Sequence, residues 1–335
     1  MSHKLLKLEK QTIVITGASS GIGLATGRLA ANRGARVVLA ARDEIALAEI
    51  SGKLNAAGGT TIFVPTDVAD QEQIDRLAAR TIEQFGGFDS WVNNAGVGII
   101  STAEEISSAD HHRLFEVNYF GLVYGSLAAA SHYRATGKPG AIINLGSAVS
   151  DMPQMLSVAY SASKHAIKGF TDGLRIELNQ EGLPISVTLI KPSAIDTRFF
   201  DHAKSNVGGM GQAPGSNYAP EVVAEAILFA AQHHRRDIAV GNTSLLGGRL
   251  ASMAPGVIDT VQQNWSYDQL VDYGHMPEAE NLHDVPSEGH ETSRFGHGRN
   301  VSVTTMAQMH PMLSLGALVV ASAAVILAIG NSRRH

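Results

Sequence analysis

Apolar and polar positions alternate along the chain in two repeating forms. From Thr12 onward, short apolar runs rich in β-branched residues are separated by longer stretches in which apolar residues recur at helical spacing. This alternation is typical of βαβ units, which build a parallel sheet covered by helices. We therefore expect an α/β fold with about seven parallel strands, at 12–16, 36–40, 61–66, 90–93, 140–146, 186–190 and 237–241.

Glycine marks the ends of the expected helices. The first helix, expected over 21–32, stops before Gly34, and another, expected over 71–85, stops before Gly86 and Gly87. Glycine is common at such ends because it adopts the left-handed conformation that closes a helix. The pattern predicts one α/β domain over residues 1–241.

The chain changes character after residue 241. Residues 242–276 contain apolar side chains that can pack on the core, whereas residues 277–311 are polar, contain Gly and His, and show no period. We expect the first segment to be an extension packed on the core and the second to be a flexible linker.

Residues 312–330 carry no charge and are followed by Arg333 and Arg334. A helix of this length spans about 28 Å at ~1.5 Å per residue, close to the ~30 Å of a bilayer core. We expect a C-terminal membrane helix, with the folded domain facing the cytoplasm. The alternative is an interface helix in a soluble cytoplasmic oligomer.

Composition and charge exclude several classes of function. The 335 residues carry 26 Lys and Arg against 31 Asp and Glu, a net charge of −5, and no cysteine. Without a basic block the chain is not expected to bind nucleic acid. Without thiols it has no disulfide and no thiolate metal site. The histidines of the expected linker are too widely spaced for a metal site, so we expect none: His275, His283, His290 and His297.

A glycine-rich turn follows the first strand. Gly17, Gly21 and Gly23 stand in TGASSGIG, where the first helix begins. A dinucleotide pyrophosphate binds backbone N–H groups at such a helix start, because glycine permits its approach and the helix dipole favours an anion. The spacing and position of the three glycines therefore predict a dinucleotide site.

Further polar residues follow the carboxyl ends of later strands, the edge at which open α/β sheets bind ligands. Tyr160 and Lys164 lie four residues apart, which places them on one face of a helix. The others are NNAG at 93–96 after the fourth strand, Asn118 in the following helix, and Ser147 after the fifth strand.

Together these motifs resemble the short-chain dehydrogenase/reductase family. The resemblance covers about residues 7–241 and rests on TGASSGIG, NNAG, Asn118, Ser147 and YSASK, in that order. It implies a doubly wound fold of the Rossmann type, a nicotinamide cofactor, and a catalytic group of Asn118, Ser147, Tyr160 and Lys164. It places the cofactor along Gly17, Ser19, Ser20, Gly21, Ile22, Gly23, Asp67, Val68, Asn94, Ala95, Gly96, Tyr160, Lys164, Pro192, Ile195 and Thr197.

The side chains of the catalytic group suit carbonyl reduction. Tyr160 would donate the proton that the alkoxide needs, although a free phenol has a pKa of ~10. We expect the ammonium of Lys164 and the positive nicotinamide to lower that pKa. Ser147 would hold the substrate oxygen, and the resemblance implies that Asn118 holds a water connecting Lys164 to solvent.

The end of the second strand indicates which nicotinamide is used. An acidic residue there would bind a free ribose 2′-hydroxyl, but the chain has Ala41 followed by Arg42, which can pair with a 2′-phosphate. We therefore expect NADP(H). Asp43, beside Arg42, is the feature that speaks against this choice.

After the sixth strand, KPSAIDT resembles the segment that lies over the nicotinamide in the family. Ser193 stands where glycine is usual, so a turn that needs a positive φ would be strained there. The following residues, 198–218, combine Phe199, Phe200 and Met210 with four glycines. We expect this stretch to be a mobile substrate lid.

One helical stripe has two interpretations. It is either core or a dimer face, and the resemblance favours a homodimer or homotetramer: Ala162, Ala166, Phe170, Leu174 and Leu178. The expected function is an NADP(H)-dependent oxidoreductase that interconverts a carbonyl and a secondary alcohol on a small, hydrophobic substrate. The alternatives are a catalytically inactive, membrane-tethered nucleotide-binding scaffold or sensor, and an epimerase or dehydratase on the same fold.

Overall fold

The computed structural model describes residues 3–213, 217–286, 289–296 and 298–310. The expected membrane helix over 312–330 lies outside the described residues. Within the described part, no helix is both long enough and apolar enough to cross a bilayer.

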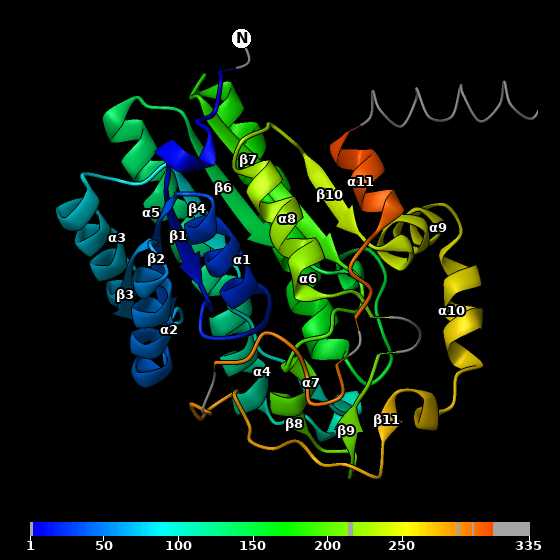
Figure 1. The fold of residues 1–335 in the computed structure, drawn as a ribbon. Coiled ribbons are helices and arrows are strands. Elements are labelled where there is room, and N and C mark those ends of the chain that lie inside the picture. Colours follow the sequence, from blue (N-terminus) through cyan, green and yellow to red (C-terminus); the bar gives the residue numbers. More distant parts are fainter. Residues whose placement is uncertain (1–2, 214–216, 287–288, 297, 311–335) are drawn as a thin grey trace, which may run out of the picture.

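A seven-stranded parallel sheet forms the centre of the molecule (Figure 1). Its order is β10-β7-β6-β4-β1-β2-β3, so the chain starts in the middle and winds outward in both directions. The strands are β1 (Thr12–Thr16), β2 (Arg36–Ala41), β3 (Thr60–Pro65), β4 (Ser90–Asn93), β6 (Gly140–Leu145), β7 (Ile185–Pro192) and β10 (Asp237–Val240). This confirms the predicted doubly wound α/β fold, with the strands where the apolar runs place them.

Helices cover both faces of the sheet, which is why the strands are apolar throughout. Ile13 and Ile15 pack into one hydrophobic cluster and Val14 packs into the other, as alternate side chains of one strand must. On the first face lie α1 (Gly21–Asn32), α2 (Glu44–Ala56) and α8 (Pro220–Ala230); on the second lie α3 (Gln71–Phe85), α4 (Ser108–Phe115), α5 (Gly121–Thr136) and α6 (Val158–Gln180).

Short elements complete the described part. They are β5 (Ile99–Ile100), β8 (Lys204–Ser205), β9 (Met210–Gly211), β11 (Val271–Asp272), α7 (Phe199–His202), α9 (Gly248–Met253), α10 (Pro255–Gln263) and α11 (Val303–Met309), with single turns at η1 (Leu8–Lys10), η2 (Ala103–Glu105), η3 (Glu116–Phe120), η4 (Ala148–Ser150), η5 (Thr243–Gly247) and η6 (Tyr267–Gln269).

Side-chain amides bind the backbone at both edges of the sheet. At the β3 edge, the N–H of Thr61 donates to Asn55 Oδ1 (2.7 Å) and Asn55 Nδ2 donates to the Thr61 carbonyl (3.0 Å). At the β10 edge, the N–H of Ala239 donates to Gln308 Oε1 (3.0 Å) and Gln308 Nε2 donates to the Ala239 carbonyl (2.9 Å). Each amide thus takes the place that a further strand would have.

The extension over 242–276 packs on the domain. Trp265, Leu270 and Val271 join a hydrophobic cluster with Ile100 and Leu156. β11 pairs antiparallel with β9, which belongs to the expected lid. The extension therefore lies against the expected lid.

The described residues of 277–311, the stretch expected to be a flexible linker, lie against the domain, and their flexibility stays a prediction. We call the described residues 277–286, 289–296 and 298–299 the strap; they cross the edge at which the strands end (orange in Figure 1). The N–H of Gly289 donates to the Ser19 carbonyl, and the N–H of Ala219 donates to the Arg299 carbonyl. The segment has no hydrophobic period because polar contacts hold it, and such contacts leave no periodic pattern in a sequence.

Candidate active site

The glycine turn after β1 forms a cradle with no room for side chains. Gly17 has a φ of +64°, and a Cβ on Gly23 would lie 2.1 Å from the Gly17 carbonyl oxygen. Asn94 fixes the turn, since its Nδ2 donates to the carbonyls of Thr16 (2.9 Å) and Gly17 (3.1 Å). The start of α1 therefore borders a groove, as the approach of a pyrophosphate requires, and the Gly21 N–H there donates to the His290 carbonyl (3.0 Å).

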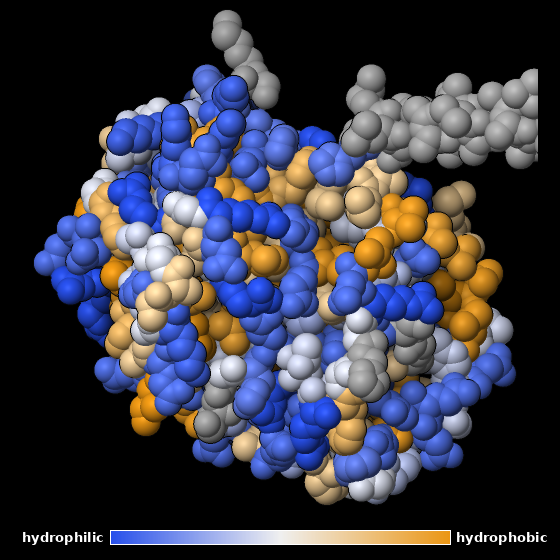
Figure 2. Space-filling model, viewed as in Figure 1, coloured by the Kyte–Doolittle hydropathy of each residue, from blue (hydrophilic) through white to orange (hydrophobic). Residues whose placement is uncertain are grey.

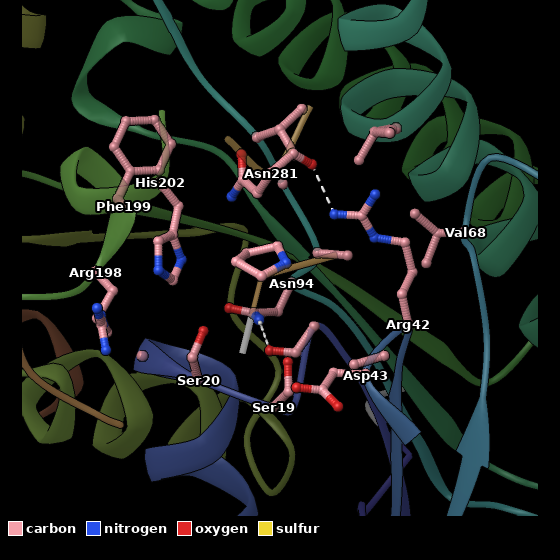
Figure 3. A pocket seen from close by; sticks show the side chains of 18 of the residues that line it. Ser19, Ser20, Arg42, Asp43, Val68, Asn94, Arg198, Phe199, His202 and Asn281 are labelled. Carbon is pink, nitrogen blue, oxygen red and sulfur yellow. Dashed lines mark hydrogen bonds between the residues drawn. The ribbon is translucent and has the colours of Figure 1, made fainter. Parts of the chain in front are cut away.

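Most of the predicted cofactor residues line this groove (Figure 3). They are Gly17, Ser19, Ser20, Gly21, Ile22, Arg42, Asp67, Val68, Asn94, Ala95, Gly96 and Thr197. Gly23 lies beneath the turn and is not part of the lining. The groove thus fits a dinucleotide in shape and in the chemistry of its walls.

Arg42 and Asp43 occupy one end of the groove. Arg42 Nη2 donates to the carbonyl of Asn281 in the strap (2.6 Å). Asp43 caps α2, with Oδ1 accepting from the N–H of Ala46 (3.0 Å). The carboxylate that speaks against a 2′-phosphate therefore also has a structural role as a helix cap.

Asp67 and Val68 follow β3 in the same groove. Asp67 Oδ2 pairs with Arg113 (2.7 Å) and its Oδ1 accepts from the N–H of Ala69 (3.0 Å). These contacts fix the carboxylate. Val68 is buried and offers an apolar wall.

Ser147, Tyr160 and Lys164 come together in an adjoining cavity. Ser147 follows β6 and caps the turn η4, while Tyr160 and Lys164 lie one turn apart near the start of α6. Lys164 Nζ donates to the Leu145 carbonyl (2.8 Å) and lies 5.5 Å from the centre of the Tyr160 ring. Pro192 and Ile195, at the end of β7 and just beyond, line the same cavity.

Burial shifts the pKa of both titratable groups of this cavity. It raises the pKa of Tyr160 to about 12, an effect that a hydrogen bond from Ser147 only partly opposes. It lowers the pKa of Lys164 to about 8. The expected lowering of the phenol pKa is therefore not produced by the protein alone, because desolvation of the phenolate outweighs the nearby ammonium.

Asn118 is buried in the π-helical turn η3, between α4 and α5. Its Oδ1 accepts from the N–H of Val97 (2.8 Å), and its Nδ2 donates to the Val97 carbonyl (3.0 Å) and to Ser163 Oγ (3.2 Å). The side-chain amide thus holds the NNAG turn against α6. Its expected role of holding a water stays a prediction.

Ser193 occupies its turn without strain. Leu156 is the one non-glycine residue of the described part with a positive φ, so Ser193 does not have one. Gly241 makes the room, since its φ is +92° and a Cβ there would lie 2.1 Å from Ser193 Oγ. The backbone strain expected for a positive φ at Ser193 is therefore absent.

The walls of the catalytic cavity are largely apolar. Phe199 lies against Tyr160, with ring centres 5.2 Å apart. Sequence reasoning missed several lining residues, among them Met152, Gln154 and Trp265. Trp265 lies more than 100 residues from Tyr160 in the sequence, so no local signal links them; Phe199 and Phe200 fall in the expected lid.

The expected lid over 198–218 is held at several points in its described part. β8 pairs with β5, and β9 pairs with β11 of the extension. Residues 214–216 lie outside the described residues. The mobility of the lid stays a prediction.

Two histidines of the C-terminal segment have carboxylate partners. His275 contacts Asp272 and His283 contacts Asp110, each at 2.8 Å. Among the residues that the structure describes, no three His, Asp or Glu side chains come together as metal ligands would.

Comparison with known proteins agrees with this geometry. The family described as short chain dehydrogenase matches residues 11–208, more than half of the chain. A Bacillus subtilis protein named uncharacterized oxidoreductase YxnA is 42% identical over 315 residues, which cover 93% of this chain and 88% of that protein. This match reaches far into the C-terminal extension.

Two solved structures share the fold. A short-chain dehydrogenase/reductase from Burkholderia phymatum in complex with NAD has a TM-score of 0.69 and 28% identity, covering 76% of this chain and 97% of that one. An alcohol dehydrogenase from the archaeon Thermococcus sibiricus, complexed with 5-hydroxy-NADP, has a TM-score of 0.60 and 27% identity, covering 69% and 95%. This chain belongs to the short-chain dehydrogenase/reductase family of oxidoreductases.

Proposed function

We propose that the protein is an NADP(H)-dependent oxidoreductase that interconverts a carbonyl and a secondary alcohol on a hydrophobic substrate. The observation that carries this proposal is the meeting of Ser147, Tyr160 and Lys164 in an apolar cavity beside a dinucleotide groove. A bound nicotinamide dinucleotide supplies or accepts the hydride and, when oxidised, adds a positive ring next to the phenol.

The residues of the chain handle the proton and the substrate. The Ser147 hydroxyl donates to the substrate oxygen and orients it. The Tyr160 hydroxyl donates its proton to that oxygen as the alcohol forms. Its high pKa in the structure makes it a weak acid until positive charge is added nearby. Lys164 supplies part of that charge, and Asn118 fixes the turn beside it.

The choice of NADP(H) rests on Arg42. It lines the groove directly after β2, where Ala41 replaces the acidic residue that a free 2′-hydroxyl would require. The substrate class rests on the walls of the cavity, formed by Phe199, Phe200, Met152 and Trp265. The competing hypothesis is a protein that binds the nucleotide but catalyses no reaction.

The test is Tyr160→Phe, assayed by NADPH oxidation with a panel of apolar ketones and aldehydes. We expect the rate to fall by about 10²–10⁴ while NADPH still binds, since one proton-transfer group is removed. Tyr124→Phe on α5 is the control and should retain the wild-type rate. Equal rates for wild type and Tyr160→Phe on every substrate would refute the enzymatic proposal, and turnover without net NADPH consumption would indicate an epimerase or dehydratase.

A further inference from the structure

The strap pairs with the glycine turn through its backbone. The N–H of Gly21 donates to the His290 carbonyl (3.0 Å), and the N–H of Gly289 donates to the Ser19 carbonyl (2.9 Å). Gly21 is the first residue of α1, where the pyrophosphate of a dinucleotide would lie. The strap therefore contacts the glycine turn at the residue with which α1 begins.

The strap also forms the outer wall of the groove. Asn281, Val285 and Pro286 line it, and Figure 3 shows Asn281 across the groove from Ser19 and Ser20. The backbone of Asn281 holds this wall in place, since its carbonyl accepts from Arg42 Nη2 (2.6 Å) and its N–H donates to the His202 carbonyl (2.9 Å).

Polar contacts fasten the strap on both sides of the groove. On the cofactor side, Glu291 binds Arg28 of α1 through two hydrogen bonds (2.6 and 2.7 Å). On the substrate side, Ser293 Oγ donates to Asp196 (2.6 Å), a buried carboxylate that follows β7.

These fastenings are of a kind that can open. The Arg28 and Glu291 side chains are 36% and 19% exposed, and ion pairs at such sites contribute little individually. Val285 and Phe295 of the strap are about half exposed, whereas Leu282 is fully buried in the second hydrophobic cluster. Leu282 therefore anchors the start of the strap in the core, and the described residues beyond it, 283–286 and 289–296, can detach without unfolding the core.

We propose that the strap is the outer wall and the gate of the cofactor site. The ligand is a nicotinamide dinucleotide that lies between the glycine turn and the strap. Entry and release of the cofactor require the described residues beyond Leu282 to detach. This inference rests on the proposed cofactor, and it adds to the site a segment that has the composition of a linker.

The first test measures the rate of NADPH release by stopped-flow fluorescence in the full chain. Glu291→Gln and Ser293→Ala each remove one fastening. We expect release to be about threefold faster in each variant and about tenfold faster in the double variant, as loss of contacts worth under about 1 kcal/mol each would give.

Two matched control variants distinguish the loss of a strap contact from the loss of a carboxylate beside α1. Glu221→Gln removes the other carboxylate of Arg28, which lies on α8, and Glu225→Gln removes the partner of Arg33. Both should release NADPH at nearly the wild-type rate. If the double variant also does so, or if the controls accelerate release equally, the gate is refuted while the proposed function stands.

The second test needs no substitution. Hydrogen exchange of the Gly21 and Gly289 amides should slow by about tenfold or more when NADPH saturates the wild-type protein, because a closed strap protects both. Equal exchange with and without NADPH would overturn the proposal. Failure of the wild-type protein to bind either NADPH or NADH would overturn both the gate and the proposed function.

Discussion

Lys164 is a buried cation that donates to a backbone carbonyl, and its burial lowers its pKa to about 8. Below that pH the folded chain must hold a charge in a poorly solvated place. An unfolded chain keeps the ordinary lysine pKa of about 10.5. The catalytic cavity therefore destabilises the fold at neutral pH, a cost that active sites commonly carry.

Lys164→Met should reveal this cost as a pH-dependent gain in stability. At pH 7 both states of wild type are protonated, and the full penalty of about 3 kcal/mol applies at 1.36 kcal/mol per pKa unit. As the pH rises from about 8 to 10.5 the penalty disappears, because the folded state loses its proton first. Urea unfolding of wild type and Lys164→Met at pH 7 and pH 10.5 would measure this penalty. A stability difference between the two proteins that is equal at both pH values would contradict the prediction.

Arg42→Ala tests the cofactor choice at the same scale. Loss of a charge-assisted contact to a 2′-phosphate should raise the KM for NADPH about 10- to 100-fold, and that for NADH far less. Arg33→Ala, at the distal end of α1, is the control and should change neither. Similar small effects on both cofactors would show that Arg42 does not bind the 2′-phosphate.

Among the elements, the turn between β1 and α1 leaves no room for an added side chain at Gly23. Gly23→Ala would place a Cβ 2.1 Å from the Gly17 carbonyl oxygen, so the turn must shift. We expect NADPH affinity to fall at least about tenfold and the protein to be destabilised by about 1–3 kcal/mol, as overpacking typically does. Calorimetric titration and thermal unfolding would measure both.

Gly173→Ala on α6 is the matched control. A Cβ there meets nothing within 4 Å, and alanine favours a helix interior by up to about 1 kcal/mol over glycine. The variant should bind NADPH as wild type does and unfold at an equal or higher temperature. If both variants lost affinity alike, the clash at Gly23 would not be the cause.

The strands and most of the site could be predicted from the sequence because their signals are local. Apolar runs mark the strands, and TGASSGIG marks a turn whose geometry only glycine allows. Tyr160 and Lys164 are neighbours through helical spacing alone. Such features depend on residues a few positions apart.

The strap and the rear of the cavity could not be predicted because they depend on contacts between distant residues. Glu291 meets Arg28 across 263 positions, and Ser293 meets Asp196 across 97. A polar stretch held by such contacts has the composition of a linker. The raised pKa of Tyr160 in the protein alone likewise could not be predicted, because burial is a property of the whole cavity.

At the scale of the molecule, one surface is unusually apolar. Figure 2 shows apolar side chains gathered over α9 and α10. They recur at helical spacing and are 42–85% exposed: Leu246, Leu250, Met253, Val257 and Val261. Thr243, just before them in the chain, lines the catalytic cavity. A lipid surface against this patch would bring apolar substrates close to the active site.

The membrane helix over 312–330 stays a prediction, and removal of this segment tests it. Full-length protein should stay with membranes through alkaline carbonate extraction, whereas a chain ending at His310 should be released, because the apolar segment is absent. The cut falls after α11, so the β10 edge stays covered. Release of both chains, with loss of oligomers in the shorter one, would identify an interface helix instead.

The two amides at the sheet edges have a consequence during synthesis. Asn55 precedes Thr61 by six residues, so the first edge is covered almost as soon as its strand leaves the ribosome. Gln308 follows Ala239 by 69 residues, and at ~5–20 residues per second it is translated about 3–14 s later. Throughout that interval the nascent β10 strand can pair with a neighbouring chain. Newly made protein is therefore most open to misassembly at this edge, and slow translation of the codons for residues 240–308 would prolong the risk.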